Sequence, residues 1–474
     1  MTGLATARVA AALAVLLLAG CSTPRLPSRA ATALPERWQA SLPELPHGGD
    51  VQTLTDWCRR FDDPLLAELI GQAQADNPSL AQALARIGQA RAGLQSARAQ
   101  RWPGLTANAQ ATRVASAASG FNAASQAGAA VDAQWEIDLF GGTRAAVAAA
   151  EARSDQAALG WHAARISLAA DVAQSYVGLR SCEAQRTVLE QDAASQAQTA
   201  TLTREKVRVG FEAPANGALA DGAAADASNR ATAQRADCEV LLQTLVALTG
   251  QPTAALRSRL AARSGMLPQP AAFAVTTLPA QLLAQRPDIA TAEREVVAAA
   301  AEVGVAEAAR YPRLSFNGSL GIAGLRVGGV SSDGNTWGFG PALSLPLFDA
   351  GQRAAKQEAA VARYDEARAA LDARLRSAVA EVEEALLRLD AANRREADAL
   401  RAAQGFRDFF AAAESRWRIG AGSLIDREDA RRIALNAQSA LLTVQRERVA
   451  AWVTLYRVLG GGWSATDDVP PNTK

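Results

Sequence analysis

The sequence predicts a mostly helical fold with a small β part, in which one structural unit occurs twice. Alanine-rich helical runs at 78–103 and 287–312 both open and close on proline, and they are related by one shift (287 − 78 = 312 − 103 = 209). Each run is followed by two segments of alternating apolar and polar residues, and then by a very long helical run. A glycine follows each long run, at Gly210 and Gly420, which are also 210 residues apart (420 − 210). This repetition along most of the chain predicts a duplicated fold.

Composition excludes several classes of protein. The 474 residues carry a formal net charge of +1, and 20% of them are charged, so the chain has no basic surface for nucleic acid. Aromatic residues make up only 5% of the chain, and alanine is abundant, which suits long, closely packed helices. The only histidines, His47 and His162, lie in unrelated contexts, and no catalytic triad, metal-binding or phosphate-binding motif is present. We therefore expect no catalysis, no metal and no cofactor.

The N-terminus predicts export and lipidation. A basic residue precedes the apolar run Val9–Ala19, which is too short to span a bilayer and is followed directly by Gly-Cys. The sequence Leu-Ala-Gly-Cys resembles a bacterial lipobox, which predicts a signal peptide over 1–20, a lipid on Cys21 and a lipid-anchored segment over 21–63. Ser22 favours the outer membrane by the same resemblance. The alternative is an ordinary signal peptide with an incidental cysteine.

Four segments alternate between apolar and polar residues, which indicates strands with one apolar and one polar face. Two lie in the first repeat (64–272) and two in the second (273–462), before a C-terminal tail (463–474). The predicted strands are 104–115, 129–140, 313–323 and 336–347. Residues 116–128 and 324–336 are rich in Gly, Ser and Ala and are predicted as exposed loops. The alternative, two hairpins on a soluble core, is disfavoured because no other segment offers a layer for them to pack against.

The strands are the part of the chain suited to a membrane. After the N-terminal run, no stretch reaches the roughly 18 apolar residues that a membrane helix needs. Apart from the helix, only a closed β-barrel satisfies its own backbone hydrogen bonds in lipid. Strands of about ten residues are long enough to span the membrane in such a barrel. Four strands are too few to close a barrel around a lumen. The unpaired N–H and C=O groups at their open edges would cost too much free energy in lipid. We therefore predict that three subunits each contribute four strands to one barrel of twelve.

The remaining sequence predicts long helices paired as two antiparallel hairpins. Glycine-marked turns at 210–217 and 420–423 separate the helices of each pair. A heptad seam runs along one of the two longest helices at Leu371, Leu375, Ala378, Val382, Ala385 and Leu389. The heptads alone leave an ordinary amphipathic bundle open as an alternative. The predicted helices are 64–101, 143–209, 217–249, 279–310, 352–419 and 424–459.

These features, in this order, resemble the outer-membrane factors of bacterial efflux systems of the TolC/OprM type, and within them the NodT-like lipoprotein branch. The resemblance extends from Cys21 to Trp463. It is carried by both strand pairs and by Asp56-Trp57, Asn77-Pro78-Ser79-Leu80, Leu139-Phe140-Gly141-Gly142, Gln285-Arg286-Pro287-Asp288-Ile289, Leu347-Phe348-Asp349-Ala350-Gly351 and Arg418-Ile419-Gly420. It implies a homotrimeric tunnel, with a twelve-stranded β-barrel in the outer membrane and an α-helical barrel in the periplasm. The implied partners are a periplasmic adaptor (membrane fusion) protein and an inner-membrane RND-type pump.

The resemblance also implies a gate at the periplasmic mouth. Asp426 and Asp429 match by position the acidic pair that rings this mouth in the family, and three copies of the pair would attract cations. Arg418, just before the turn, is a candidate partner for salt links that hold the mouth shut. The alternative is that Ser423 caps the following helix, whose dipole the two acids complement.

Two cysteines are placed symmetrically about the first hairpin turn. Cys182 and Cys238 are equally far from it, since 210 − 182 = 28 and 238 − 210 = 28. In an antiparallel hairpin they could face each other, and a disulfide suits an oxidising periplasm. The alternative is a pair of small buried thiols. No role is predicted for Cys58, and the geometry of the first tip around Pro214 is left open.

The predicted function is that of a passive exit duct of a tripartite efflux pump, which exports small molecules such as drugs or toxic compounds across the outer membrane. The energy must come from a partner, because no motif here binds nucleotide. One alternative is the outer-membrane channel of a type I protein-secretion system. Another is a lipid-anchored periplasmic coiled-coil scaffold without a pore, which the strand alternation disfavours. The sequence does not identify the exported substrate.

Overall fold

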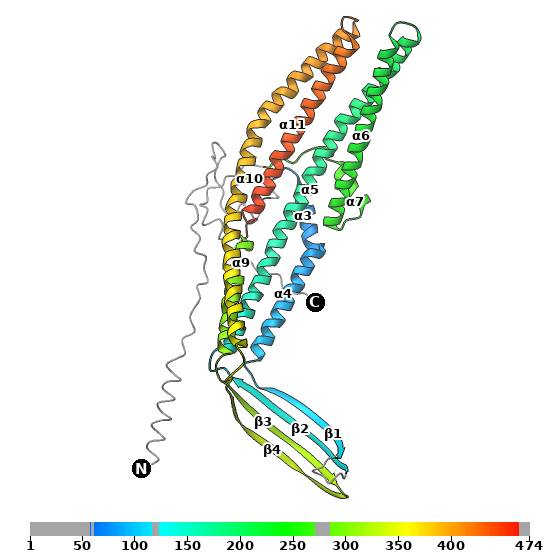
Figure 1. Ribbon diagram of the computed structural model, residues 1–474. Helices are drawn as coiled ribbons and strands as arrows, with labels where there is room; N and C mark the ends of the chain where they lie inside the picture. The colour runs from blue at the N-terminus through cyan, green and yellow to red at the C-terminus, as the bar shows by residue number, and fades with distance from the viewer. Residues whose placement is uncertain (1–56, 58–60, 116–122, 271–284, 464–474) are drawn as a thin grey trace. The chain divides into compact units, whose positions relative to one another are not determined.

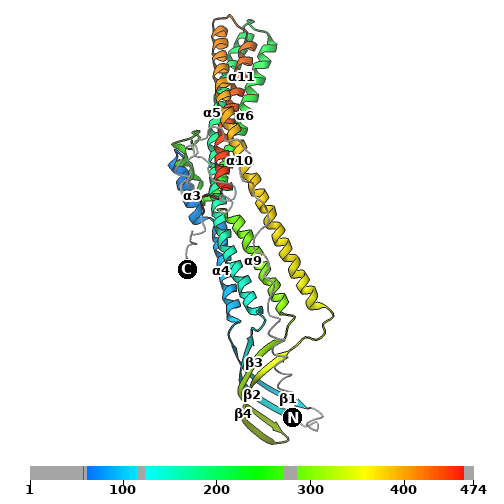
Figure 2. The same ribbon diagram turned by 90° about the vertical axis from the view of Figure 1, so that its left-hand side faces the viewer.

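The computed structural model describes residues 57, 61–115, 123–270 and 285–463 (Figures 1 and 2). The predicted signal peptide, Cys21, Cys58 and residues 464–474 lie outside the described residues. The chain forms two compact units, and each unit takes segments from both halves of the sequence. Of the described residues, the first unit contains 85–115, 123–159 and 290–374, and the second contains 57, 61–84, 160–270, 285–289 and 375–463.

An antiparallel sheet of four strands, in the order β1-β2-β3-β4, belongs to the first unit. The strands are β1 (Gly104–Ala115), β2 (Ala123–Ile137), β3 (Arg313–Val327) and β4 (Val330–Ser344). β2 pairs with β3, so the two hairpins from the two halves of the chain form one continuous sheet. The predicted four strands are confirmed.

The predicted loop at 324–336 is wrong. β3 runs to Val327 and β4 begins at Val330, so a two-residue turn joins them. Gly328 and Gly329 both have positive φ (56° and 87°), and this backbone lets a two-residue turn follow the twist of the strands. The Gly and Ser residues on either side therefore pair across the hairpin instead of forming a loop. β2 likewise begins inside the segment predicted as the loop 116–128.

Long helices make up most of the described chain (Figure 1). They are α3 (Pro64–Asp76), α4 (Pro78–Ala99), α5 (Gly142–Arg208), α6 (Pro214–Thr249), α7 (Thr253–Ala261), α9 (Pro287–Ala308), α10 (Gln352–Arg418) and α11 (Leu424–Val458). The predicted helix 64–101 is divided at Asn77, which has extended backbone and accepts a hydrogen bond from the Ser79 amide at 2.9 Å. α6 starts three residues earlier than predicted (217 − 214), because Pro214 suits the first turn of a helix. The short helix α7 was not predicted.

After each strand pair, an aspartate caps the long helix that follows. Asp138 accepts hydrogen bonds from the amides of Thr143 and Arg144 at the start of α5 (3.1 and 2.9 Å). Asp349 accepts one from the Arg353 amide at the start of α10 (3.2 Å). Each carboxylate satisfies amides that a helix N-terminus leaves free.

The helical hairpins α5–α6 and α10–α11 are confirmed. Gly210 and Gly420 have φ of 80° and 76°, which is the left-handed backbone that glycine adopts at helix ends. The seam predicted on α10 is buried, with Val382, Ala385 and Leu389 at most 1% exposed. Within the described part of the chain, no helix combines the length and apolar character needed to cross a membrane.

Candidate functional site

The four-stranded sheet has one apolar and one polar face. Strand pairing aligns Val131 of β2 with Leu320 of β3, and Leu320 with Trp337 of β4. Because side chains alternate along each strand, large apolar residues from all four strands lie together on this face. They are Leu105, Val131, Trp135, Phe316, Leu320, Ile322, Trp337, Phe339 and Leu343. Leu320 is 67% exposed and Trp337 is 72% exposed, so this face needs an apolar environment outside the chain.

Except near the β3–β4 turn, where it exposes Val114, Leu325 and Val330, the opposite face of the sheet carries small and polar side chains. Asn108 of β1 donates a hydrogen bond to Asp132 of the neighbouring strand β2 at 2.6 Å. The face also carries Thr106, Gln134, Asn317 and Ser319. A sheet that is apolar on one side and polar on the other fits a barrel wall between lipid and a water-filled lumen.

Aromatic side chains gather where the strands meet the helices. Phe140 stacks on Tyr311 with ring centroids 4.7 Å apart, and Trp102 is 75% exposed. The indole N–H of Trp135 donates to the carbonyl oxygen of Arg101 at 3.0 Å. Rings with an apolar body and a polar edge are typical of the boundary between a membrane and water. Trp135 therefore marks this boundary and not the middle of the sheet.

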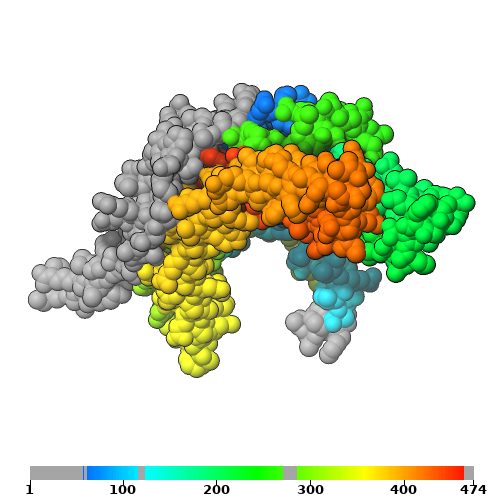
Figure 3. Space-filling view, turned by 90° about the horizontal axis from the view of Figure 1, so that it is seen from above, coloured from blue at the N-terminus to red at the C-terminus, as the bar shows by residue number. Residues whose placement is uncertain are grey.

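The tips of the helical hairpins expose apolar side chains. Figure 3 shows these hairpins from above, with α6 in green and the hairpin of α10 and α11 in orange. Val209 and Phe211 at the first tip are 54% and 85% exposed, and Ile419 and Ile425 at the second tip are 80% and 51% exposed. Exposed apolar residues gathered at helix ends are typical of protein contacts.

The residues predicted to form a gate are at the second tip, and in one chain they make local contacts. Ser423 accepts a hydrogen bond from the Asp426 amide at 3.0 Å, and Asp426 accepts one from the Ser423 amide, which completes a capping box. Hydrogen bonds from the hydroxyl and then the amide of Ser423 hold the pKa of Asp426 below its usual value. Asp429 pairs with Arg432 at 3.2 Å, and both aspartates are exposed.

Arg418 is not brought to either aspartate. Its guanidinium lies 3.3 Å from Glu414, one turn earlier on α10. Glu414 also pairs with Arg427 of α11 at 3.3 Å. The helix cap considered as the alternative role of these residues is therefore present, and it leaves the two carboxylates exposed.

Buried arginines near the second tip were not identified from the sequence. Arg427 is 4% exposed, donates to Thr199 of α5 at 2.8 Å and lies 4.7 Å from the ring centroid of Trp417. Arg431, one turn later, pairs with Asp192 at 2.9 Å, and the side chains are only 6% and 1% exposed. Such charge pairs fix the register of α11 against α5, because a buried charge left unpaired is costly.

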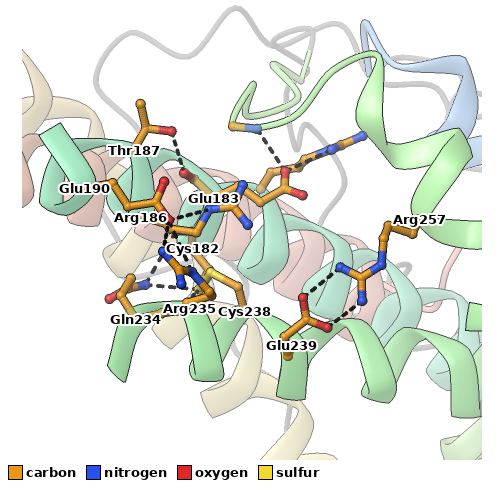
Figure 4. Close-up of a disulfide and its surroundings, with 12 residues drawn as sticks. Cys182, Glu183, Arg186, Thr187, Glu190, Gln234, Arg235, Cys238, Glu239 and Arg257 are labelled. Carbon is orange, nitrogen blue, oxygen red and sulfur yellow. Dashed lines mark hydrogen bonds and ion pairs between the residues drawn. A yellow bond between two sulfur atoms is a disulfide. The ribbon is translucent and has the colours of Figure 1, made fainter. Parts of the chain in front are cut away.

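Cys182 and Cys238 are joined by a disulfide between α5 and α6 (Figure 4), with Cα atoms 5.6 Å apart. Gln234 donates to the Cys182 sulfur at 3.0 Å. Figure 4 also shows the forked pair between Arg257 of α7 and Glu239, with contacts of 2.7 and 2.6 Å. The first hairpin is thus crosslinked at the level where α7 packs beside it.

A buried polar network lies close to the disulfide. Tyr176 donates to Asp63 at 2.6 Å and accepts from Arg180 at 2.9 Å. Arg180 is fully buried and also donates to Glu183 at 3.0 Å and to the Leu260 carbonyl at 2.8 Å. Burial, and then the hydrogen bond to Asp63, raise the pKa of Tyr176 above its usual value. The network ties the start of α3 to α5 and α7.

Side chains that bind metal ions are not clustered in the described residues. No group of three or more His, Cys, Asp or Glu residues there is arranged to hold a metal ion. His162 is buried beside Trp161, with ring centroids 4.9 Å apart, and belongs to the core.

Three comparisons bear on the family of the chain. The family model described as outer membrane efflux protein matches residues 69–251 and 278–461. Outer membrane protein OprJ of Pseudomonas aeruginosa is 32% identical over 467 residues, with 96% of each chain covered. The toluene efflux pump outer membrane protein TtgI of Pseudomonas putida is 28% identical, with 96% of this chain and 98% of the relative covered.

The solved structure of the outer-membrane channel OprN is similar in fold and sequence. It is 28% identical with a TM-score of 0.79, and 92% of this chain and 99% of that chain are covered. The two segments matched by the family model fall in the two halves of the chain that the sequence repeat defines. The chain therefore belongs to the outer membrane efflux protein family, and it is the outer-membrane channel component of an efflux pump, not an enzyme.

Proposed function

We propose that three copies of this chain form one exit duct, with a twelve-stranded barrel in the outer membrane and the helical hairpins in the periplasm. The observation that carries the proposal is the four-stranded sheet with one exposed apolar face. Its outer strands, β1 and β4, each have one edge without a partner strand in the described part of the chain. Unpaired edges are not tolerated in lipid, and four strands are too few to enclose a lumen.

The proposed partners are a periplasmic adaptor protein and an inner-membrane RND-type pump. Phe211 and Ile419 at the hairpin tips give an adaptor apolar contacts, since both are at least 80% exposed. The chain supplies a passage and no energy, so the pump drives transport. A lipid on Cys21 is proposed to anchor the mature chain to the same membrane.

The proposed cargo is small and apolar. TtgI is named for toluene efflux, and similarity to it supports small toxic compounds as the cargo of the present pump. A type I protein-secretion channel is the competing assignment. Deletion of the gene should sensitise cells to solvents and apolar drugs, and loss of a secreted protein without such sensitisation would favour the competing assignment.

The channel itself is tested by reconstitution. Purified protein added to a planar bilayer should produce discrete conductance steps, because the barrel encloses water. Protein that retains its β-content, inserts stably and never conducts would contradict a duct.

We further propose that Asp426 and Asp429 surround the periplasmic entrance in the trimer and make it cation-selective. Their exposure in one chain leaves them free to face other copies. Charges gathered at a narrow entrance attract counter-ions. In the trimer, repulsion between copies would act against the hydrogen bonds that lower the pKa of Asp426 in one chain.

Two matched variants separate a gate from a helix cap. The change D426N/D429N removes the charges, whereas Ser423→Ala removes the hydroxyl of the cap and keeps both carboxylates. The gate predicts reduced cation selectivity in D426N/D429N alone, and S423A should lose only about 1 kcal/mol of stability. Single-channel recordings with a melting curve give both readouts. Equal selectivity in folded D426N/D429N and in the unmodified protein would remove the aspartates from the gate.

A further inference from the structure

Two arginines and two serines form a row across one end of the sheet, where β3 turns into β4. Arg113 of β1 is opposite Ser125 of β2, and Ser125 is opposite Arg326 of β3. Arg326 is in turn opposite Ser331 of β4. We call these four residues the outer row. It crosses all four strands, and it alternates a guanidinium with a hydroxyl.

The outer row lies on the apolar face of the sheet. Side chains alternate along a strand, so Arg113 shares a face with Leu105, an even number of residues away (113 − 105 = 8). Arg326 shares a face with Leu320 for the same reason (326 − 320 = 6). Both arginines are exposed. They therefore stand on the side that faces lipid and not on the side that faces the lumen.

The position of the outer row along the strands places it at the depth of lipid head groups. Leu320 is the central residue of β3, since 320 − 313 and 327 − 320 are both 7. A strand tilted by about 40° advances roughly 2.5 Å per residue along the membrane normal, so Arg326 lies about 15 Å from the level of Leu320. The apolar band of such a barrel is about 25 Å tall, and half of it is about 12 Å. Arg326 is thus just beyond the hydrocarbon.

The surface here is hollowed. A depression of about 490 Å³ is lined by residues of the outer row, among them Arg113, Ser125 and Arg326, together with Asp333. Asp333 adds a carboxylate to this face, two residue pairs closer to the middle of the sheet. Both guanidinium groups are exposed, so an anion from outside the protein can reach them.

We propose that the outer row binds the phosphate groups of the phosphorylated glycolipid of the outer leaflet, lipid A. This inference rests on the proposed function, which directs this end of the sheet towards the cell exterior. Arginine binds phosphate through paired N–H donors. The Ser125 hydroxyl adds a donor between the two arginines, and the Ser331 hydroxyl adds one beyond Arg326. Arg113 and Arg326 are separated by two strand spacings, about 10 Å. This separation suits a head group of two sugars, each of which carries a phosphate.

The competing explanation is that each arginine only extends its head group to water beyond the lipid. The two explanations predict different effects of removing the charge. A site for lipid A loses affinity for that lipid, whereas arginines that only reach water leave lipid binding unchanged. The depression and the alternation of donors across four strands support the site.

The test measures binding of lipid A to the purified full-length trimer by native mass spectrometry. R113Q/R326Q removes both charges of the outer row and keeps a polar, flexible side chain at each position. R313Q is the matched control, because Arg313 is also exposed but stands at the other end of β3 and on the other face. Each lost charge-assisted contact should weaken binding about tenfold. We expect the unmodified protein and R313Q to bind lipid A equally, and R113Q/R326Q, which loses two such contacts, to bind it about a hundredfold more weakly.

Two further probes identify the ligand. Lipid A without its phosphates should bind all three proteins equally weakly, and phosphatidylglycerol should bind the unmodified trimer more weakly than lipid A does. Equal binding of lipid A by R113Q/R326Q and R313Q would overturn the proposal. Equal binding of phosphatidylglycerol and lipid A would overturn the choice of glycolipid. If R113Q/R326Q fails to assemble, R113K/R326K, which keeps both charges, replaces it. We expect this variant also to bind lipid A more weakly, because lysine lacks the two parallel N–H donors of the guanidinium.

The lipid A site and the exit duct can be refuted independently. Conductance of R113Q/R326Q in a planar bilayer should equal that of the unmodified protein, because the outer row does not line the lumen. A conducting protein with no preference for lipid A would refute the outer row alone. A protein that never conducts would refute the duct, whatever lipid it binds.

Discussion

Replacing Leu320 by arginine tests whether the apolar face of the sheet is in contact with lipid. Leu320 is 67% exposed, lies between Val131 and Trp337, and is the central residue of β3. This position is close to the middle of the bilayer if the sheet is part of a barrel. An arginine facing lipid at that depth costs about 2–4 kcal/mol. A trimer has three such sites, so the cost for the whole barrel is about 6–12 kcal/mol.

The neighbouring residue provides a matched control. Ser319 is on the polar face, opposite Asp132, so Ser319→Arg places the same side chain at the same depth but in the lumen. Its cost should be below about 1 kcal/mol, as for surface substitutions in general. Phe316→Arg adds a second comparison, since Phe316 is paired with the boundary residue Trp135. Its cost should fall between those of the other two, because the penalty declines towards the interface.

The measurement is the free energy of unfolding in lipid vesicles, from urea titrations of the three variants and the unmodified protein. The expected order of destabilisation is L320R, then F316R, then S319R. Equal midpoints for L320R and S319R would show that the two faces have the same surroundings, and the barrel would have to be abandoned.

Four other predictions concern the assembly of the trimer, the lipidation of Cys21, the disulfide and the buried Tyr176. Native mass spectrometry in detergent should show three chains, and a stable monomer with full β-content would count against the barrel. The intact mass should correspond to a chain that begins at an acylated Cys21. With Cys182 and Cys238 paired, the denatured and unreduced mature chain should contain one free thiol, Cys58 (4 − 2 − 1 = 1), and three would exclude the disulfide. The raised pKa of Tyr176 means that folding favours the neutral phenol. The contribution of Tyr176 to stability is therefore complete below about pH 10 and is lost only at higher pH. Ultraviolet titration should show one tyrosine that ionises at higher pH than the others, or only when the protein unfolds.

The duplication, the strand pairs and their faces were already determined by the sequence. The alternation in Val131–Ile137 assigns each side chain to a face, whatever the strand pairs with. The glycines at 210 and 420 mark the helix turns for an equally local reason, since they permit positive φ. Such features depend on residues that are close together in the sequence, so they can be predicted from the sequence alone.

The contacts between distant segments were decided by the tertiary structure. Arg431 and Asp192 are 239 residues apart (431 − 192), and no local pattern marks either as buried. Arg418 is exposed and pairs within its own helix, although its place beside the turn suggested another partner. The long loop expected at 324–336 became paired strands because Gly and Ser residues suit loops in isolation, whereas pairing across the sheet satisfies their backbone hydrogen bonds. Burial and pairing of this kind depend on which surfaces meet, and that is a property of the folded chain.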